Sequence, residues 1–290
     1  MIRIRRLVVL VVACLVAIAV PAVAPASAAY PALLTGVRAA HYPGFDRVVF
    51  DFYGGLPSST PDTGYVGGPA LIGDPSGRPV YVAGRYILQF TMRGARGHTE
   101  NGTDTSPNRT AFALPNVLTV VQSGDFEGVV TYGIGVASRQ SFRVFTLSSP
   151  PRVVVDIDTG FSWTNRSVWF YDSNANLRSV QRPIITSAPA HGLMDRLFAG
   201  PTNAEKAVGL RFISSRAKFY SNLTVNSDEV AEVRLRGGCS SGGSTATIAG
   251  EIFPTLKQLP NVDHVTIYDY YGNTENPTGT SDSIPECLEP

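Results

Sequence analysis

Two short motifs could present a reactive side chain, and the first is Asp158-Thr159-Gly160. An Asp-Thr-Gly turn at the end of an apolar run can hold a carboxylate for acid–base hydrolysis. That chemistry needs two carboxylates that share a proton, and therefore a second turn of the same kind. The chain contains no second Asp-Thr-Gly or Asp-Ser-Gly, and Asp156 occupies a position where the motif requires an apolar residue. We therefore expect a strand that ends in a turn.

The second motif is Gly238-Cys239-Ser240-Ser241-Gly242, which matches the G-x-S-x-G pattern of a nucleophilic serine between a strand and a helix. Such a serine needs a histidine base and an acid that orients the histidine. Only His264 lies downstream, and its neighbour Asp263 stands too close in sequence to orient it. The surrounding segment is also too small for an α/β-hydrolase. The pattern is better explained by a structural loop.

The remaining candidates for catalysis are scattered along the chain. The four histidines form no pattern of zinc ligands; they are His41, His98, His191 and His264. Acidic residues in the first half could supply a pair for glycoside hydrolysis, namely Glu100, Asp104, Asp125 and Glu127. Solvated acidic loops are the ordinary explanation for such residues. The sequence thus predicts a protein that is not an enzyme and that carries no metal or other cofactor.

Two aromatic segments could instead bind a ligand. In the loop at 124–128, Phe126 stands between Asp125 and Glu127, where its ring could stack on a sugar; alternatively, Phe126 packs inward. Near the C-terminus, Tyr268 and Tyr270 should lie on the same face of one strand. That face either binds a ligand or covers the core.

The elements that must position these residues fall into two parts. From residue 33 to 158, β-rich runs alternate with clusters of Gly, Pro, Asn and Asp, and no stretch keeps helical periodicity. The predicted strands cover 47–52, 86–90, 117–121, 129–136, 142–147 and 152–158. This pattern predicts an N-terminal all-β domain that resembles a β-sandwich.

The second part mixes strands and helices. A hairpin is predicted over 168–180, and strands over 217–225, 230–235 and 265–271. Helices are predicted over 188–199 and 245–258, although Pro254 should kink or interrupt the second helix. The C-terminal domain is therefore predicted to be α+β. The boundary lies near a short polar linker at 161–166.

The N-terminus is typical of a secretory signal. Three arginines precede an apolar run from Leu7 to Val20, and the small residues that follow predict cleavage between Ala28 and Ala29. The run holds 14 residues, whereas a membrane-spanning helix needs roughly 20. A retained anchor and lipidation at Cys14 are the two alternatives. We expect a secreted protein without a transmembrane anchor after processing.

The net charge of the mature chain and its two remaining cysteines are consistent with an exported protein. Loss of the three signal arginines leaves 21 basic and 23 acidic groups, so electrostatic binding to nucleic acid is not expected. Only three residues are lysine, a bias typical of GC-rich genomes such as those of actinobacteria. Cys239 and Cys287 predict a disulfide that closes a loop of about 48 residues, although two free buried thiols are possible.

Two stretches resemble known families. The first half is similar to the AMIN-like domain of exported actinobacterial proteins over 44–52, 124–129, 134–136, 142–144 and 151–157. The second half resembles the GerMN domain, named from sporulation and germination proteins, over 197–205, 241–244 and 256–262. These resemblances imply an organisation of signal peptide (1–28), AMIN-like domain (29–160), linker (161–166) and GerMN-like domain (167–290).

Neither resemblance implies a catalytic site, and both imply a cell-envelope module that binds glycan or protein. We therefore expect a non-catalytic envelope protein whose partner is peptidoglycan, another wall glycan or an envelope protein. One alternative is an envelope hydrolase with an unrecognised carboxylate site, and another is a purely structural docking module. The sequence specifies neither the ligand nor the oligomeric state.

Overall fold

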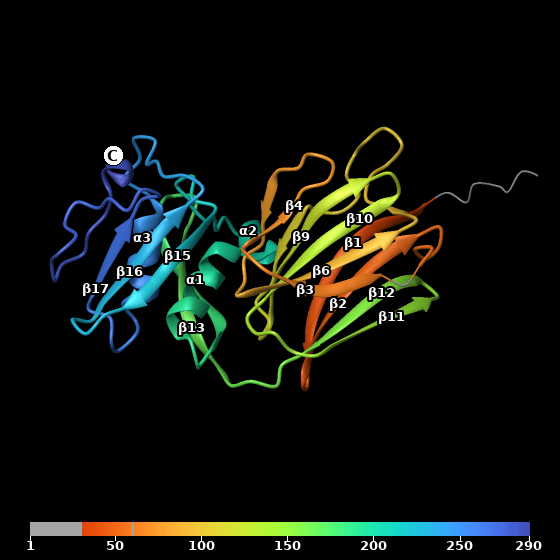
Figure 1. Cartoon of the computed structure of the whole chain (residues 1–290), viewed down its shortest axis with the longest axis horizontal. Coiled ribbons are helices and arrows are strands. Elements are labelled where there is room, and N and C mark those ends of the chain that lie inside the picture. Colours follow the sequence, from red (N-terminus) through yellow and green to blue (C-terminus); the bar gives the residue numbers. More distant parts are fainter. Residues whose placement is uncertain (1–30, 60) are drawn as a thin grey trace, which may run out of the picture.

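The computed structural model describes residues 31–290 except residue 60, and it contains two domains packed side by side (Figure 1). The predicted signal peptide, its cleavage site at Ala28–Ala29 and the alternative lipidation site at Cys14 lie outside the described residues. Within residues 31–290, no helix has the length and apolar character needed to cross a membrane.

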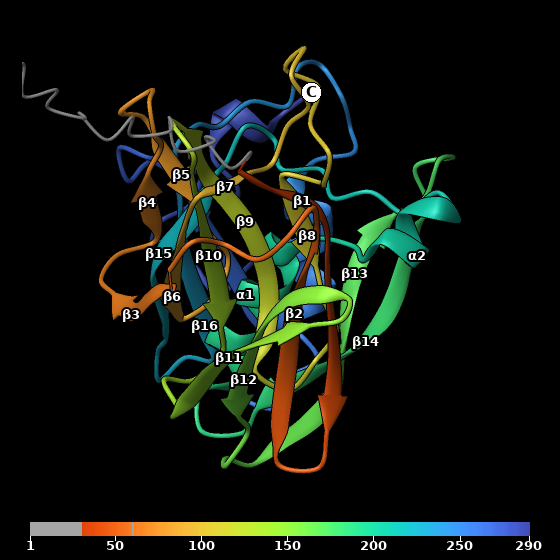
Figure 2. The same ribbon diagram turned by 90° about the vertical axis from the view of Figure 1, so that its right-hand side faces the viewer.

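The N-terminal domain is a β-sandwich, as the sequence predicted. One five-stranded sheet has the order β11 (Phe142–Ser148), β12 (Pro151–Asp158), β2 (Phe45–Tyr53), β1 (Ala32–Tyr42) and β7 (Ala95–Arg96). The other has the order β3 (Asp62–Val66), β6 (Tyr86–Arg93), β10 (Val129–Val136), β9 (Val117–Phe126) and β8 (Arg109–Ala111). A small ribbon pairs β4 (Ala70–Ile72) with β5 (Pro79–Tyr81). In Figure 2 the sandwich stands in front of the second domain.

Aromatic rings fill the space between the two sheets. Phe50 of β2 stacks on Phe90 of β6, with ring centroids 4.9 Å apart, and meets Tyr132 of β10 edge-on at 5.2 Å. All three side chains are fully buried. Burial of each such ring stabilises the fold by about 2 kcal/mol, and this stabilisation fixes the face of each strand that turns inward.

The C-terminal domain is α+β, also as predicted. It opens with a hairpin of β13 (Trp163–Tyr171) and β14 (Leu177–Ile185), followed by α1 (Pro189–Ala199) and α2 (Asn203–Ala207). A three-stranded sheet contains β15 (Phe219–Val225), β16 (Val230–Arg236) and β17 (His264–Tyr268); α3 (Ile248–Leu256) connects the last two strands, which are parallel. The chain ends near the 3₁₀ helix η1 (Glu286–Leu288). Both longer helices contact the hairpin and the sheet.

Three boundaries differ from the sequence prediction. The hairpin begins at Trp163, inside the segment predicted as the linker 161–166, because β13 pairs with β14 over its whole length. Helix α3 starts at Ile248, includes Pro254 and ends two residues beyond it. Strand β17 ends at Tyr268, so the prediction that Tyr268 and Tyr270 share a strand face is wrong.

A buried arginine joins the domains. Arg196 of α1 is 1% exposed, and its guanidinium reaches five backbone carbonyls. One of them belongs to Pro183 of its own domain, and the other four belong to the segment 112–117 of the sandwich. Burial, followed by the charge of Arg182, lowers the pKa of Arg196 to about 9, so the side chain remains cationic at neutral pH.

A carboxylate holds the same segment from the opposite side. Asp46 is fully buried, and its Oδ2 accepts hydrogen bonds from the amides of Asn116 (2.6 Å) and Val117 (2.9 Å). Its Oδ1 lies 2.7 Å from His41 Nδ1. In the segment 112–117, backbone amides thus donate to the Asp46 carboxylate, and backbone carbonyls accept from the Arg196 guanidinium. Each charge therefore faces the end of the peptide dipole that has the opposite sign.

A disulfide between Cys239 and Cys287 fastens the C-terminus. It links the loop after β16 to η1, and Ser241 N donates a hydrogen bond to Cys287 O at 2.7 Å. Leu288 beside it is 1% exposed and belongs to the core of the C-terminal domain. The bond thus closes a loop that contains α3 and β17.

Removal of this disulfide should destabilise the C-terminal domain. The chain-entropy model gives a loss of about 4 kcal/mol for a 48-residue loop. Urea unfolding of Cys239→Ala/Cys287→Ala should therefore show a much lower midpoint, and reduction of the native protein should reproduce it. An unchanged midpoint would mean that core packing alone holds the terminus.

Replacement of the joining arginine should loosen the two domains. Arg196→Met leaves five carbonyls without their donor and should cost at least about 3 kcal/mol. Limited proteolysis should then cut more rapidly between β12 and β13. The matched control is Arg178→Met, which removes the ion pair between the exposed Arg178 and Asp172 and should leave the cleavage rate nearly unchanged. Equal cleavage rates for the two variants would disprove the role of Arg196.

Candidate functional site

The predicted loop at 124–128 is the turn between β9 and β10, and its three candidate residues have different environments. Asp125 is largely buried: its Oδ2 accepts a hydrogen bond from Gly97 N (3.0 Å) and lies 2.6 Å from His98 Nδ1. Phe126 does not pack inward, because 43% of it is exposed. Glu127 is exposed and has a positive φ of 48° in the turn. Asp125 therefore positions the neighbouring loop, and Phe126 remains available for contacts.

An open groove of about 470 Å³ lies beside this hairpin and is called the polar groove below. It is lined by Asp74, His98, Gly102, Asp104, Asn108, Gln122, Ser123, Gly124 and Asp125. Phe126 does not line it. The volume falls within the range of about 300–1,000 Å³ that is common for ligand sites. The side chains offer amide, carboxylate and imidazole groups at one concave surface.

Loops and a strand bring these side chains together. Asp74 N donates a hydrogen bond to Ser123 O (2.9 Å), which places the β4–β5 loop against β9. Asn108 Nδ2 donates to Asp104 Oδ2 at 2.9 Å, and Gln122 N donates to Asn108 O at 2.8 Å. The set spans about fifty residues of sequence, so no local motif predicts it. His98, Asp104 and Asp125 were among the candidates found in the sequence.

The C-terminal tyrosines lie in a turn after β17. Asp269 forms this turn by accepting a hydrogen bond from Asn273 N at 2.8 Å. Tyr270 is 54% exposed and Tyr271 is 84% exposed, with ring centroids 5.4 Å apart, whereas Tyr268 is partly buried at the strand end. The guanidinium of Arg236 lies 5.1 Å from the centre of the Tyr270 ring. The exposed aromatic pair is therefore Tyr270–Tyr271.

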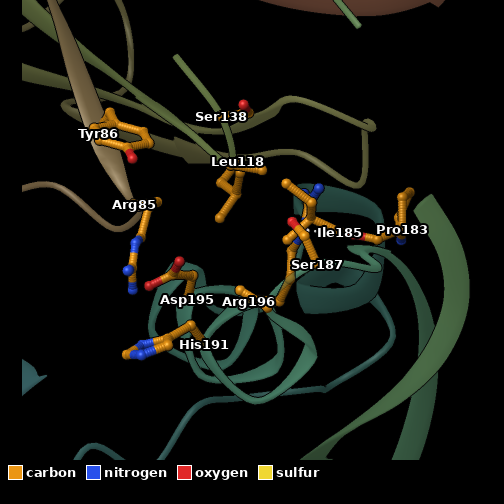
Figure 3. A pocket seen from close by; sticks show the side chains of 13 residues that line it. Arg85, Tyr86, Leu118, Ser138, Pro183, Ile185, Ser187, His191, Asp195 and Arg196 are labelled. Carbon is orange, nitrogen blue, oxygen red and sulfur yellow. Dashed lines mark hydrogen bonds between the residues drawn. The ribbon is translucent and has the colours of Figure 1, made fainter. Parts of the chain in front are cut away.

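A smaller cleft separates the two domains near α1 (Figure 3). Arg85 extends from the sandwich toward His191 and Asp195 on α1. Just before Arg85, the backbone packs closely on β10: a Cβ at Gly135 would stand 1.9 Å from the Ala83 carbonyl oxygen. The cleft measures about 240 Å³, below the usual size of a ligand site.

The cleft contains a buried acid. Asp195 Oδ1 accepts a hydrogen bond from the Tyr220 hydroxyl at 2.8 Å, and His191 Nδ1 lies 3.3 Å from the same hydroxyl. Burial raises the pKa of Asp195 to about 6, although Tyr220, Arg85 and Arg196 oppose this shift. Burial also lowers the pKa of His191. Among the described residues, no serine, threonine or cysteine side chain is hydrogen-bonded to a histidine.

The two sequence motifs have structural roles. Ser240 lies beyond the end of β16, whereas His264 pairs with Val230 at the start of the same strand. The two residues therefore stand about 20 Å or more apart along the sheet, too far for proton transfer. Cys239 of the same motif is in the disulfide.

The aspartates around the Asp-Thr-Gly turn also have structural roles. Asp156 accepts hydrogen bonds from Arg47 (2.6 and 2.9 Å) and Arg143 (2.9 Å), and the arginines outweigh burial and lower its pKa. The amide of Asp158 donates to Ser141 O, and that of Thr159 donates to Gly44 O. The turn closes the end of the sandwich.

The raised pKa of Asp195 predicts a specific dependence of stability on pH. The folded protein favours the protonated acid, so stability falls as the pH rises from about 4 to about 6 and then levels off. Asp195→Asn keeps a hydrogen-bond acceptor for Tyr220 but cannot ionise, so the variant does not lose stability over this pH range. It should raise the free energy of unfolding by about 2 to 3 kcal/mol at pH 7.5 and by little at pH 4. Lower stability of the variant at both pH values in urea would contradict this.

Part of the chain is similar to known proteins. Residues 32–159 match the family model of the AMIN-like domain. No curated protein shows significant similarity to the chain. Among solved structures, the tandem GerMN domains of the sporulation protein GerM from Bacillus subtilis align with 44% of this chain and 46% of their own, at 16% identity and a TM-score of 0.30. The alignment thus spans less than half of that structure. The N-terminal β-sandwich is an AMIN-like domain.

Proposed function

We propose that this protein is a non-catalytic module of the cell envelope that binds wall glycan, with peptidoglycan as its ligand, in the polar groove of the AMIN-like domain. The observation that carries the proposal is the concave array of hydrogen-bonding side chains beside the β9–β10 hairpin. The exposed ring of Phe126 provides an apolar surface on the same hairpin.

The chemistry of the polar groove suits sugar hydroxyls. Each hydroxyl can both donate and accept, and Asn108 and Gln122 offer amides that do the same. Asp74 and Asp104 add acceptors along the wall. The groove is open, so a polymer can lie along it without threading through the protein. No basic residue other than His98 lines it, which disfavours a strongly anionic ligand there.

Export is supported by the disulfide. Cys239 and Cys287 form a bond that persists in oxidising compartments and is rare in the cytosol. A protein that works outside the membrane would meet wall glycan there. The predicted signal peptide gives the same localisation.

Glycoside hydrolysis is the alternative that the three aspartates of the polar groove raise. It requires a general acid with a raised pKa. The two carboxyls whose pKa burial raises are Asp195, to about 6, and Glu251, to about 8. Neither lines the polar groove, and Glu251 is fully buried against the amide of Ile213. In the polar groove, Asp125 accepts a hydrogen bond from Gly97 N and Asp104 accepts one from Asn108 Nδ2, so both carboxylates have structural roles, and we favour binding over hydrolysis.

Co-sedimentation of residues 29–290 with purified peptidoglycan sacculi tests the proposal. We expect saturable pelleting without release of soluble muropeptides. Gln122→Ala should weaken binding by about fivefold, and Asn108→Ala/Gln122→Ala by more than tenfold, because each loses hydrogen bonds worth about 1 kcal/mol.

The control is Phe126→Ala, which leaves the lining of the polar groove intact and should change the affinity less than Gln122→Ala. If Phe126→Ala alone abolishes pelleting, the glycan binds at the hairpin tip instead. Absence of pelleting would refute glycan binding, and released muropeptides would show hydrolysis.

A further inference from the structure

A second groove, larger than the polar groove, is lined by residues of both domains. It measures about 670 Å³ and is called the cationic groove below. The sandwich contributes Pro79, Val80, Tyr81 and Arg109. The C-terminal domain contributes residues from the end of α1, from α2 and from the segment that leads to β15: Phe198, Ala199, Gly200, Pro201, Lys206, Leu210, Arg211, Phe212, Ser214, Ala217 and Lys218.

Four cations and no acidic residue line this groove. They are Arg109, Lys206, Arg211 and Lys218. Across residues 31–59 and 61–290, none of the four takes part in a salt bridge. The chain contains only three lysines, and the third, Lys257, is paired with Asp282 at 2.6 Å. Two lysines and two arginines without a salt bridge thus give this surface a local excess of positive charge.

The floor of the groove is apolar. Phe198 and Phe212 pack edge-on with centroids 5.4 Å apart, and Tyr81 of the sandwich stacks on Phe219 of β15 at 4.9 Å. Leu210 is partly exposed beside them. The Arg109 guanidinium donates a hydrogen bond to the Tyr81 carbonyl, which holds one cation at the rim. The cations thus surround a surface that an apolar side chain can cover.

We infer that the cationic groove binds an acidic peptide segment of a protein partner, with one or two apolar side chains against Phe198, Leu210 and Phe212. Charge complementarity selects Asp and Glu, and the apolar floor distinguishes such a segment from a purely hydrophilic polyanion. A neutral glycan would leave four cations unpaired. This inference goes beyond glycan binding, since it concerns a different surface and a different class of ligand.

Fluorescence anisotropy with residues 29–290 tests the inference. The probe is a labelled 12-residue peptide in which Glu alternates with Leu and Phe, compared with one peptide that carries Lys for Glu and another that carries Ser for Leu and Phe. We expect the acidic, apolar peptide to bind, the lysine peptide not to bind, and the serine peptide to bind at least fivefold more weakly. Binding should weaken as NaCl rises from about 50 to 500 mM, because salt screens the charges.

Variants locate the site. Lys206→Glu and Lys218→Glu should each weaken binding by about five- to tenfold, and Leu210→Ser should weaken only the apolar peptide. Arg152→Glu is the matched control, because it makes the same charge change on β12, which contributes nothing to the groove. It should leave the affinity unchanged.

Three outcomes would overturn the inference. The first is no binding of the acidic, apolar peptide. The second is equal loss with Arg152→Glu, which would indicate non-specific charge attraction. The third is equal or tighter binding of inorganic polyphosphate or of the serine peptide, which would indicate a polyanion site. Pelleting with sacculi should be unaffected by Lys206→Glu, so failure here is distinguishable from failure of glycan binding.

Discussion

The arrangement of the two domains depends on Arg196. This cation is buried at the joint without a carboxylate in direct contact, and backbone carbonyls satisfy its five N–H donors. The negative charge of Asp46 compensates the positive charge of Arg196. Asp46 binds the same segment, 112–117, by accepting hydrogen bonds from the amides of Asn116 and Val117. A buried charge without such partners costs several kcal/mol, so the joint forms only when this segment has its folded conformation. Domain packing and the closure of one end of the sandwich are therefore coupled.

This coupling divides the concave surfaces into two kinds. The polar groove is built entirely by the sandwich, so its geometry does not require the second domain. The cleft and the cationic groove take residues from both domains and therefore require that the domains be packed together. A ligand that spans the cationic groove would in turn stabilise the joint, because it binds only the assembled form. The two proposed binding activities thus differ in their dependence on one side chain.

Local patterns in the sequence predicted much of the fold and little of the surface. The β-rich run at 129–136 predicted the bounds of β10, and the apolar face of Leu193 and Leu197 predicted α1 to within a residue. Strand β1 escaped prediction because it has a bulge near Gly36 and contains small residues that weaken the alternation. The bonds of Asp125 and the lining of both grooves depend on residues far apart in sequence, so no spacing reveals them. Pro79 and Lys218, for example, line the same groove although they belong to different domains.

The reactive residue types in this chain are largely used to position backbone. Asp46 and Asp125 each pair with a histidine and fix a loop through amide hydrogen bonds. The carboxylate of Asp195 is bonded to a tyrosine inside the narrow cleft, and Asp156 is neutralised by two arginines. A general acid or base must instead face a substrate with its proton free to move. Within the described residues, the four cations of the cationic groove form no salt bridge, and charged groups of this kind at a concave surface can bind a partner.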